Sequence, residues 1–167
     1  VCDALAKLGH EVHIFAPSRK VRRGMEIQNT FSEFHGVDRR VKLDYLGRFD
    51  SIDLWWLPKP CQLFLLNVLL RRNLRRALRA KACDLLYTRT IALLPTLLAT
   101  GIPTIIELHT LPRWGRQSFV RRCNRCALLV CLTTPMREEL VQWGVVGSRV
   151  IKEGDAVDLA WFSTQHP

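Results

Sequence analysis

Residues 1–17 read VCDALAKLGHEVHIFAP, and this stretch decides the fold class. Ala4, Leu5 and Leu8 recur at helical spacing, and the glycine after them suits a left-handed helix cap. The β-branched and aromatic run over 12–17 predicts a short buried strand that stops at a proline. A helix that leads directly into such a strand is half of a βαβ unit. Because that helix should follow a strand in a parallel sheet, we expect the chain to begin inside a domain.

The rest of the chain continues this alternation of strands and helices. Strands are expected at 41–46, 83–89, 103–110, 128–134 and 149–153. A long helix is expected to begin at Pro60, and further helices are expected at 91–100, 117–127 and 135–143. Residues 18–40 are expected to form a long loop with a short helical turn near 25–34, and 48–58 a connector. The pattern predicts an α/β fold, a Rossmann-like parallel sheet with helices on both faces.

Composition limits the class of protein. The 167 residues are 48% hydrophobic and 24% charged, which is typical of a globular protein and enough for one domain with a sizeable core. The longest apolar runs, 63–70 and 91–99, are shorter than the roughly 20 residues that a membrane-spanning helix needs. We therefore expect neither a fibrous nor a disordered chain.

Six cysteines are expected to be buried, reduced thiols, because they lie in apolar or helical surroundings. Cys123 and Cys126 have the two-residue gap of a metal or redox pair, which is the alternative. A structural zinc site needs a second pair, and Cys131 is the only other thiol nearby, so no metal site is expected.

The net charge of +10 is unevenly placed. The stretch over 59–81 contains no acidic residue and seven basic ones: Lys59, Arg71, Arg72, Arg75, Arg76, Arg79 and Lys81. Its apolar residues form the opposite stripe of a helix: Leu63, Leu66, Leu70, Leu74 and Ala77. This is either a structural helix with solvated arginines or a helix that binds anionic lipid, with Trp55 and Trp56 as interfacial anchors.

Ligands of an open α/β sheet bind beyond the carboxyl ends of its strands, which selects candidate site residues. These are Ser18, Arg19, Thr88, Arg89, Thr90, Glu107, His109, Thr110, Thr133 and Thr134. Arg89 offers a fork for phosphate or carboxylate, and His109 can orient a hydroxyl or act as an acid or base. The alternative for His109 is a partly buried imidazole bonded to backbone. Glu107 projects to the same side as His109, and either orients it or caps a helix.

Two common phosphate-binding motifs are missing. The chain contains no GxG, so both the dinucleotide fingerprint and the P-loop are absent. A nucleotide-dependent oxidoreductase is therefore the weakest of the enzymatic hypotheses.

Five segments in order resemble the N-terminal domain of glycosyltransferase family 4. Residues 4–17 are similar to its GHEV-type helix and strand, and Thr133–Gly144 to one of its later helices. The remaining three are Asp84–Arg89 (DLLYTR), Gly101–His109 (GIPTIIELH) and Asp155–Phe162 (DAVDLAWF). In the last segment Ala156 stands where the family usually has glycine.

The resemblance implies half of a GT-B enzyme. Residues 1–154 would be its Rossmann-like N-terminal domain and 155–167 an exit segment toward a C-terminal domain. It implies retaining transfer from a nucleotide sugar, such as a UDP- or GDP-sugar, to a glycan or lipid-linked acceptor, with no required cofactor. It places His109 near the reacting sugar as the catalytic residue. The cleft would also contain Arg89, Thr88, Glu107, Thr110 and Thr133. The family's pair of glutamates separated by seven residues is absent here, so we expect this chain alone to be inactive.

The resemblance also implies partners. Acceptors in this family are often lipid-linked, so Arg71, Arg72, Arg75, Arg76 and Arg79 are expected to face an anionic membrane. The chain is then cytoplasmic, and peripheral at the inner face of that membrane. The competing hypothesis is a non-enzymatic basic module that binds an anionic membrane or nucleic acid. Nucleic acid is the weaker partner, since no recognition helix, zinc finger or RNP strand is present.

Overall fold

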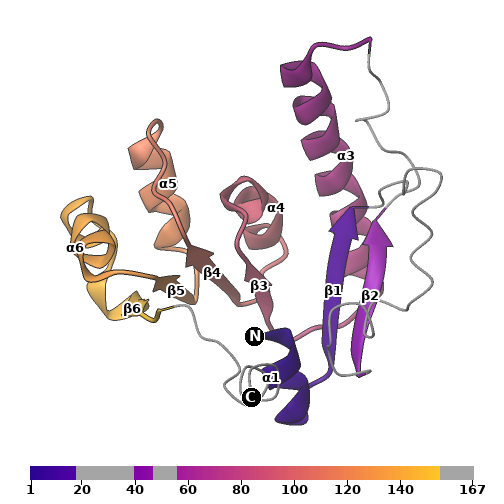
Figure 1. The fold of residues 1–167 in the computed structure, drawn as a ribbon, viewed down its shortest axis with the longest axis horizontal. Coiled ribbons are helices and arrows are strands. Elements are labelled where there is room, and N and C mark those ends of the chain that lie inside the picture. Colours follow the sequence, from indigo (N-terminus) through magenta and orange to yellow (C-terminus); the bar gives the residue numbers. More distant parts are fainter. Residues whose placement is uncertain (18–39, 47–55, 155–167) are drawn as a thin grey trace, which may run out of the picture. The chain divides into compact units, whose positions relative to one another are not determined.

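The computed structural model describes residues 1–17, 40–46 and 56–154, in which helices alternate with parallel strands (Figure 1). This confirms the α/β class. The chain divides into two compact units, Val1–Lys81 (unit 1) and Ala82–Pro167 (unit 2). The single domain expected over 1–154 stays a prediction. The expectations for 18–39, 47–55 and 155–167 lie outside the described residues.

Unit 1 opens with the predicted helix and strand. Helix α1 (Cys2–Lys7) is followed by β1 (Val12–Pro17), and Gly9 between them has a φ of +92°, the left-handed conformation that favours glycine. Leu8 differs from the expectation, because its side chain is 75% exposed while Ala6 is fully buried. The helix ends at Lys7, so its buried face is centred on Ala6 and Leu8 lies past it.

Strand β2 (Val41–Leu46) forms as predicted and pairs in parallel with β1, with Val12 opposite Val41. One face of this two-stranded sheet carries a network of charged side chains. His13 Nδ1 lies 3.1 Å from Asp44, and Asp44 also accepts a hydrogen bond from Lys81. The hydrogen bond from Lys81, then that from His13, lowers the pKa of Asp44. These surface contacts join the two strands to Lys81, the residue after the next helix.

Helix α3 (Lys59–Ala80) carries Pro60 in its first turn, as predicted. Its apolar stripe is only partly as expected. Leu74 and Leu78 are buried, whereas Leu63 is 57% exposed. The arginines at 72, 75, 76 and 79 are exposed as predicted, and Arg71 is half-buried. Only the second half of α3 therefore has a buried face, because burial depends on where the helix meets other elements and not on its period alone.

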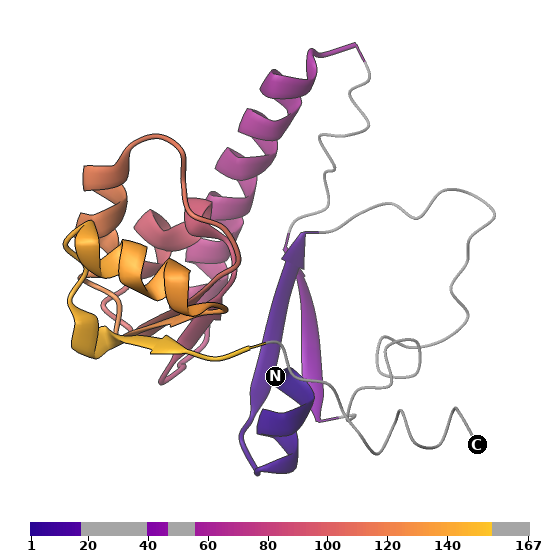
Figure 2. The same cartoon turned by 60° about the vertical axis from the view of Figure 1, so that its left-hand side comes forward.

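Unit 2 is a four-stranded parallel sheet in the order β3-β4-β5-β6. Its strands are β3 (Leu86–Thr88), β4 (Thr104–Leu108), β5 (Leu128–Cys131) and β6 (Val150–Lys152). Its helices are α4 (Leu94–Leu98), α5 (Arg116–Cys123) and α6 (Thr134–Gln142), with 3₁₀ turns at Ile91–Leu93 and Gly147–Arg149. Since each right-handed crossover steps to the next strand in the same direction, all three helices lie on one face of this sheet (Figure 2).

The core of unit 2 lies between that face and the helices. Ile106, Leu129 and Val150 are opposite one another on adjacent strands and are at most 4% exposed. The helices add Phe119, which packs edge-on against Trp143 with ring centroids 6.3 Å apart. Burial of these apolar side chains stabilises the layer of helices on the sheet.

The predicted strands and helices of unit 2 all exist, but most are shorter than expected. The strand predicted over 83–89 pairs only at Leu86–Thr88, and the helix over 117–127 ends at Cys123. The predicted glycine stops are confirmed at Gly101 and Gly144, where φ is +76° and +99°.

The thiols of Cys123, Cys126 and Cys131 are buried and free, as predicted. Burial raises the pKa of Cys123 to about 12 and that of Cys126 to about 11, so neither is the reactive thiolate of a redox pair. Cys61 is exposed, contrary to the expectation of burial, because it lies on the exposed first half of α3. Within the described ranges, no three His, Cys, Asp or Glu residues come together as a metal site.

Candidate active site

A buried carboxylate stands at the carboxyl end of the unit 2 sheet. Glu107 is the fourth residue of β4, and its side chain is only 8% exposed. A carboxylate removed from water needs hydrogen-bond donors to offset the lost hydration. The structure supplies three, all from side chains near the ends of β3 and β4.

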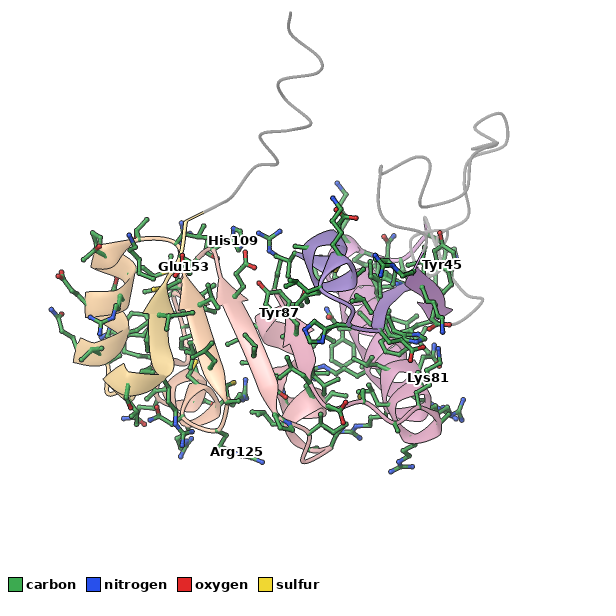
Figure 3. The ribbon with its side chains drawn as sticks, turned by 90° about the horizontal axis from the view of Figure 1, so that it is seen from below. Tyr45, Lys81, Tyr87, His109, Arg125 and Glu153 are labelled. Atoms are coloured by element: carbon green, nitrogen blue, oxygen red, sulfur yellow. The ribbon has the colours of Figure 1, made fainter. Side chains whose placement is uncertain are left out.

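Each carboxylate oxygen of Glu107 has a defined partner. Oε1 is 2.5 Å from Arg89 Nη2 and 2.5 Å from His109 Nε2. Oε2 accepts a hydrogen bond from the Tyr87 hydroxyl. Figure 3 labels Tyr87 on β3 and His109 after β4. We call Tyr87, Arg89, Glu107 and His109 the Glu107 cluster.

Sheet geometry explains why these four residues meet. Tyr87 pairs with Ile105 across β3 and β4, so Tyr87 shares a face with Ile105 and Glu107. Side chains two residues apart along a strand point to the same side, which adds Arg89 and His109. This is the face opposite the helices, since Thr88, Ile106 and Leu108 on the alternate positions are buried.

The cluster keeps Glu107 ionised. Burial by itself raises the pKa of Glu107, but the hydrogen bonds from Tyr87, His109 and Arg89 together lower it below the ordinary value of 4.5. The nearby positive charge of Arg89 acts in the same direction. At neutral pH the carboxylate therefore acts purely as an acceptor.

The side-chain contact of His109 in the structure is with this carboxylate, which favours an oriented imidazole. Its side chain is 35% exposed and that of Arg89 is 56% exposed. Of the two roles predicted for Glu107, its contact with His109 Nε2 favours orientation of the imidazole. The arrangement can hold a charged or hydroxyl-bearing ligand at the carboxyl edge of the sheet.

The three threonines that the family resemblance places in the cleft lie outside the Glu107 cluster. Thr88 is buried on the opposite face, where its hydroxyl accepts a bond of 3.0 Å from the Thr90 amide. Thr133 is the N-cap of α6, and its hydroxyl accepts from the Met136 amide at 3.3 Å. Thr110 is exposed in the loop after β4. Thr88 and Thr133 therefore have local structural roles.

One residue of the Glu107 cluster, and one exposed aromatic residue in the loop after β4, were missed from sequence. Tyr87 lies two residues before Arg89, so the period of two within the predicted strand could have found it. Trp114 is 88% exposed in the loop that joins β4 to α5, five residues after His109. No sequence pattern marks Trp114 as exposed.

Two open pockets of the described residues lie elsewhere. A hollow of about 490 Å³ is lined by Arg116, Trp143 and the exposed side of α6, and Arg116 stacks over the Trp143 ring at 4.1 Å. A second, of about 430 Å³, includes Arg125 and Arg149 at the amino end of the sheet. Neither pocket includes a member of the Glu107 cluster.

Comparison with known protein families decides the class. The sequence profile of Glycosyltransferase Family 4 matches residues 1–154. The chain belongs to glycosyltransferase family 4. No curated protein sequence matches it significantly.

Membership of glycosyltransferase family 4 over residues 1–154 confirms the resemblance of the four segments within that range, and that of Asp155–Phe162 stays a prediction. It favours an enzyme domain that handles nucleotide-sugar donors and their acceptors over a non-enzymatic basic module. It also places the Glu107 cluster on a domain that belongs to sugar-transfer enzymes, at the edge of the sheet where ligands bind.

None of the helices in the described segments is both long enough and apolar enough to cross a bilayer.

Proposed function

We propose that this domain takes part in retaining transfer of a sugar from a nucleotide-sugar donor, such as a UDP- or GDP-sugar, to a glycan or lipid-linked acceptor. The domain forms the side of the cleft that binds the acceptor. The transfer requires no metal or other cofactor. The observation that carries the proposal is the Glu107 cluster, which orients His109 at the carboxyl end of β4. We assign His109 the place next to the reacting sugar.

The variant His109→Ala, made in the full-length protein, tests this assignment. We expect turnover to fall about 100-fold, since a positioned histidine contributes a factor of at least that order. His10→Ala is the control, because His10 is an exposed histidine in the turn after α1. Circular dichroism checks that both variants fold, and the anomeric configuration of the product checks retention. Near-normal turnover of His109→Ala, or an inverted product, contradicts the proposal.

We also propose that residues 1–167 alone do not transfer sugar. The support is the absence of two glutamates separated by seven residues, together with a site that supplies only one oriented histidine. The same transfer assay on the 167-residue chain tests it. Measurable turnover by this chain overturns the proposal and leaves the role of His109 open to the first test.

A lipid-linked acceptor is favoured by the surface of α3. Its first half exposes Leu63, Phe64 and Val68 at 57%, 71% and 43%, and Trp56 before it is 66% exposed. Its second half exposes four arginines, and the helix contains no acidic residue. Exposed apolar side chains followed by arginines on one helix suit the interface of an anionic bilayer. We propose that α3 docks there, on the cytoplasmic side.

Vesicle co-sedimentation tests the docking. Binding to vesicles with phosphatidylglycerol should fall at least about tenfold when Arg72, Arg75 and Arg76 are changed to Gln, because each basic residue near the surface contributes about 1 kcal/mol. The matched control removes three exposed charges elsewhere: Arg113→Gln, Arg121→Gln and Lys152→Gln. If the α3 variant and the control variant lose vesicle binding equally, a role for α3 is contradicted. Binding of the unmodified chain to neutral phosphatidylcholine vesicles as strong as to phosphatidylglycerol vesicles also contradicts it.

A further inference from the structure

Three side chains donate hydrogen bonds to the carboxylate of Glu107. Glu107 Oε1 lies 2.5 Å from both His109 Nε2 and Arg89 Nη2, while Oε2 accepts from Tyr87. An ionised carboxylate has no hydrogen to give, so each of its partners must be the donor. The contact between Glu107 and His109 therefore requires a proton on Nε2.

Arg89 and Tyr87 both stabilise the ionised form of Glu107, which cannot donate to His109. A guanidinium stays charged at any ordinary pH, and its position on the same oxygen as His109 stabilises the ionised form of Glu107. Tyr87 donates to the other oxygen, and this hydrogen bond also stabilises the ionised form of Glu107. The lowered pKa of Glu107 agrees with this assignment of the protons.

We propose that Glu107 is a positioning residue that holds neutral His109 as its Nε2–H tautomer and thereby makes Nδ1 the nitrogen that meets the ligand. The hydrogen on one ring nitrogen of a neutral imidazole leaves a lone pair on the other. Among the described residues, Nδ1 of His109 has no hydrogen-bond partner.

The tautomer has a consequence for the ligand, and this part rests on the proposed function. A neutral Nδ1 accepts a hydrogen bond and cannot give one, so it recognises a hydroxyl donor and not a phosphate or carboxylate oxygen. His109 is thus suited to a sugar hydroxyl. The anionic part of a nucleotide sugar must find its donors elsewhere in the protein.

Long-range ¹H–¹⁵N NMR of the ¹⁵N-histidine-labelled chain reports which ring nitrogen carries the proton. At about pH 8.5, above the ordinary imidazole pKa of about 6.5, we expect one protonated Nε2 and one unprotonated Nδ1 for His109. His109→Gln assigns the signals, because it removes them. An Nδ1–H ring, or an average of both tautomers in the unmodified chain, overturns the proposal.

Two variants separate Glu107 from the rest of the cluster. Glu107→Leu should give a mixture of both tautomers, while Tyr87→Phe should keep the single Nε2–H form because Nε2 still faces Glu107. His13 is an internal control, since its partners are Glu11, Asp44 and Lys81 and its signals should not move. A single Nε2–H form in Glu107→Leu, or a mixture in Tyr87→Phe, overturns the role given to Glu107.

The activity measurement connects the tautomer to transfer. In the full-length protein, Glu107→Leu should lower kcat about 10- to 100-fold, the effect typical of losing the partner behind a functional histidine. Unchanged kcat in Glu107→Leu, with His109→Ala strongly impaired, overturns the positioning role while the proposed function stands. Unchanged kcat in both variants refutes the proposed function. The NMR result would then still report the tautomer of His109, without a link to sugar transfer.

Discussion

At the scale of single residues, the buried carboxylate of Glu107 is the group around which three other side chains are arranged. Its carboxylate is nearly inaccessible to water and accepts from Tyr87, Arg89 and His109. Hydrogen bonds to a charged group stabilise more than those between neutral groups, which offsets the cost of burial. The same contacts that keep Glu107 ionised also orient the histidine.

The lowered pKa of Glu107 predicts a pH-dependent stability. A carboxyl group whose pKa is lower in the folded chain stabilises the fold above its unfolded pKa, and this contribution is lost as pH falls through the folded value. Glu107→Gln should therefore lower the free energy of unfolding by about 2 kcal/mol at pH 7. The difference from the unmodified chain should shrink below about pH 4.5.

Urea unfolding at pH 7, 5 and 3 measures this difference. Glu138→Gln is the control, because Glu138 is exposed on α6. Glu11 and Asp44 also have lowered pKa values, but they titrate equally in the compared proteins and cancel. A difference that is constant or grows toward pH 3 contradicts a stabilising role for the ionised Glu107.

At the scale of elements, α6 shows a threonine whose role is capping. Thr133 precedes the helix in an extended conformation and bonds to the amide of Met136, the third helical residue. Leu140 of the same helix is fully buried in the core of unit 2. The cap and the buried leucine together fix where α6 begins and which face it presents to the sheet.

Thr133→Ala should destabilise unit 2 by about 1 kcal/mol, the usual cost of losing an N-cap side chain. Thr110→Ala is the matched control, since Thr110 is exposed in the loop after β4. The free energy of unfolding of both variants in urea gives the comparison. Equal values would mean that the Thr133 hydroxyl does not stabilise α6.

At the scale of the whole molecule, the six thiols fall into classes of accessibility. Cys61 is exposed, Cys2 and Cys83 are half-buried, and the three thiols of the unit 2 core are buried. Burial also raises the pKa values of the core thiols, so they are both shielded and protonated.

Thiol labelling of the native chain should therefore proceed in stages. Cys61 should react first with a thiol-specific disulfide reagent at pH 8, and Cys123, Cys126 and Cys131 only when the protein unfolds. Cys61→Ser should remove the fast phase, and mass mapping of the labelled peptides identifies each site. Rapid labelling of Cys123 or Cys126 in the folded chain would show that these thiols are accessible and contradict their burial in the core.

Much of the fold follows from the sequence because its signals are local. The period of 3.6 in helices, the period of 2 in strands and the glycine stops at Gly9, Gly101 and Gly144 depend only on near neighbours. They predict the order of the elements and place Arg89, Glu107 and His109 at strand ends. The five family-like segments, read in order, indicate glycosyltransferase family 4, and the family comparison confirms it.

Only the tertiary structure decided which residues meet. Tyr87 joins Glu107 because β3 pairs with β4 in one register, and strand order and register are set by contacts distant in sequence. The exposure of Leu8 and of the first half of α3 likewise depends on where each helix meets its neighbours. Local periodicity indicates which side of an element is apolar, whereas burial and hydrogen-bond partners arise only when the elements pack together.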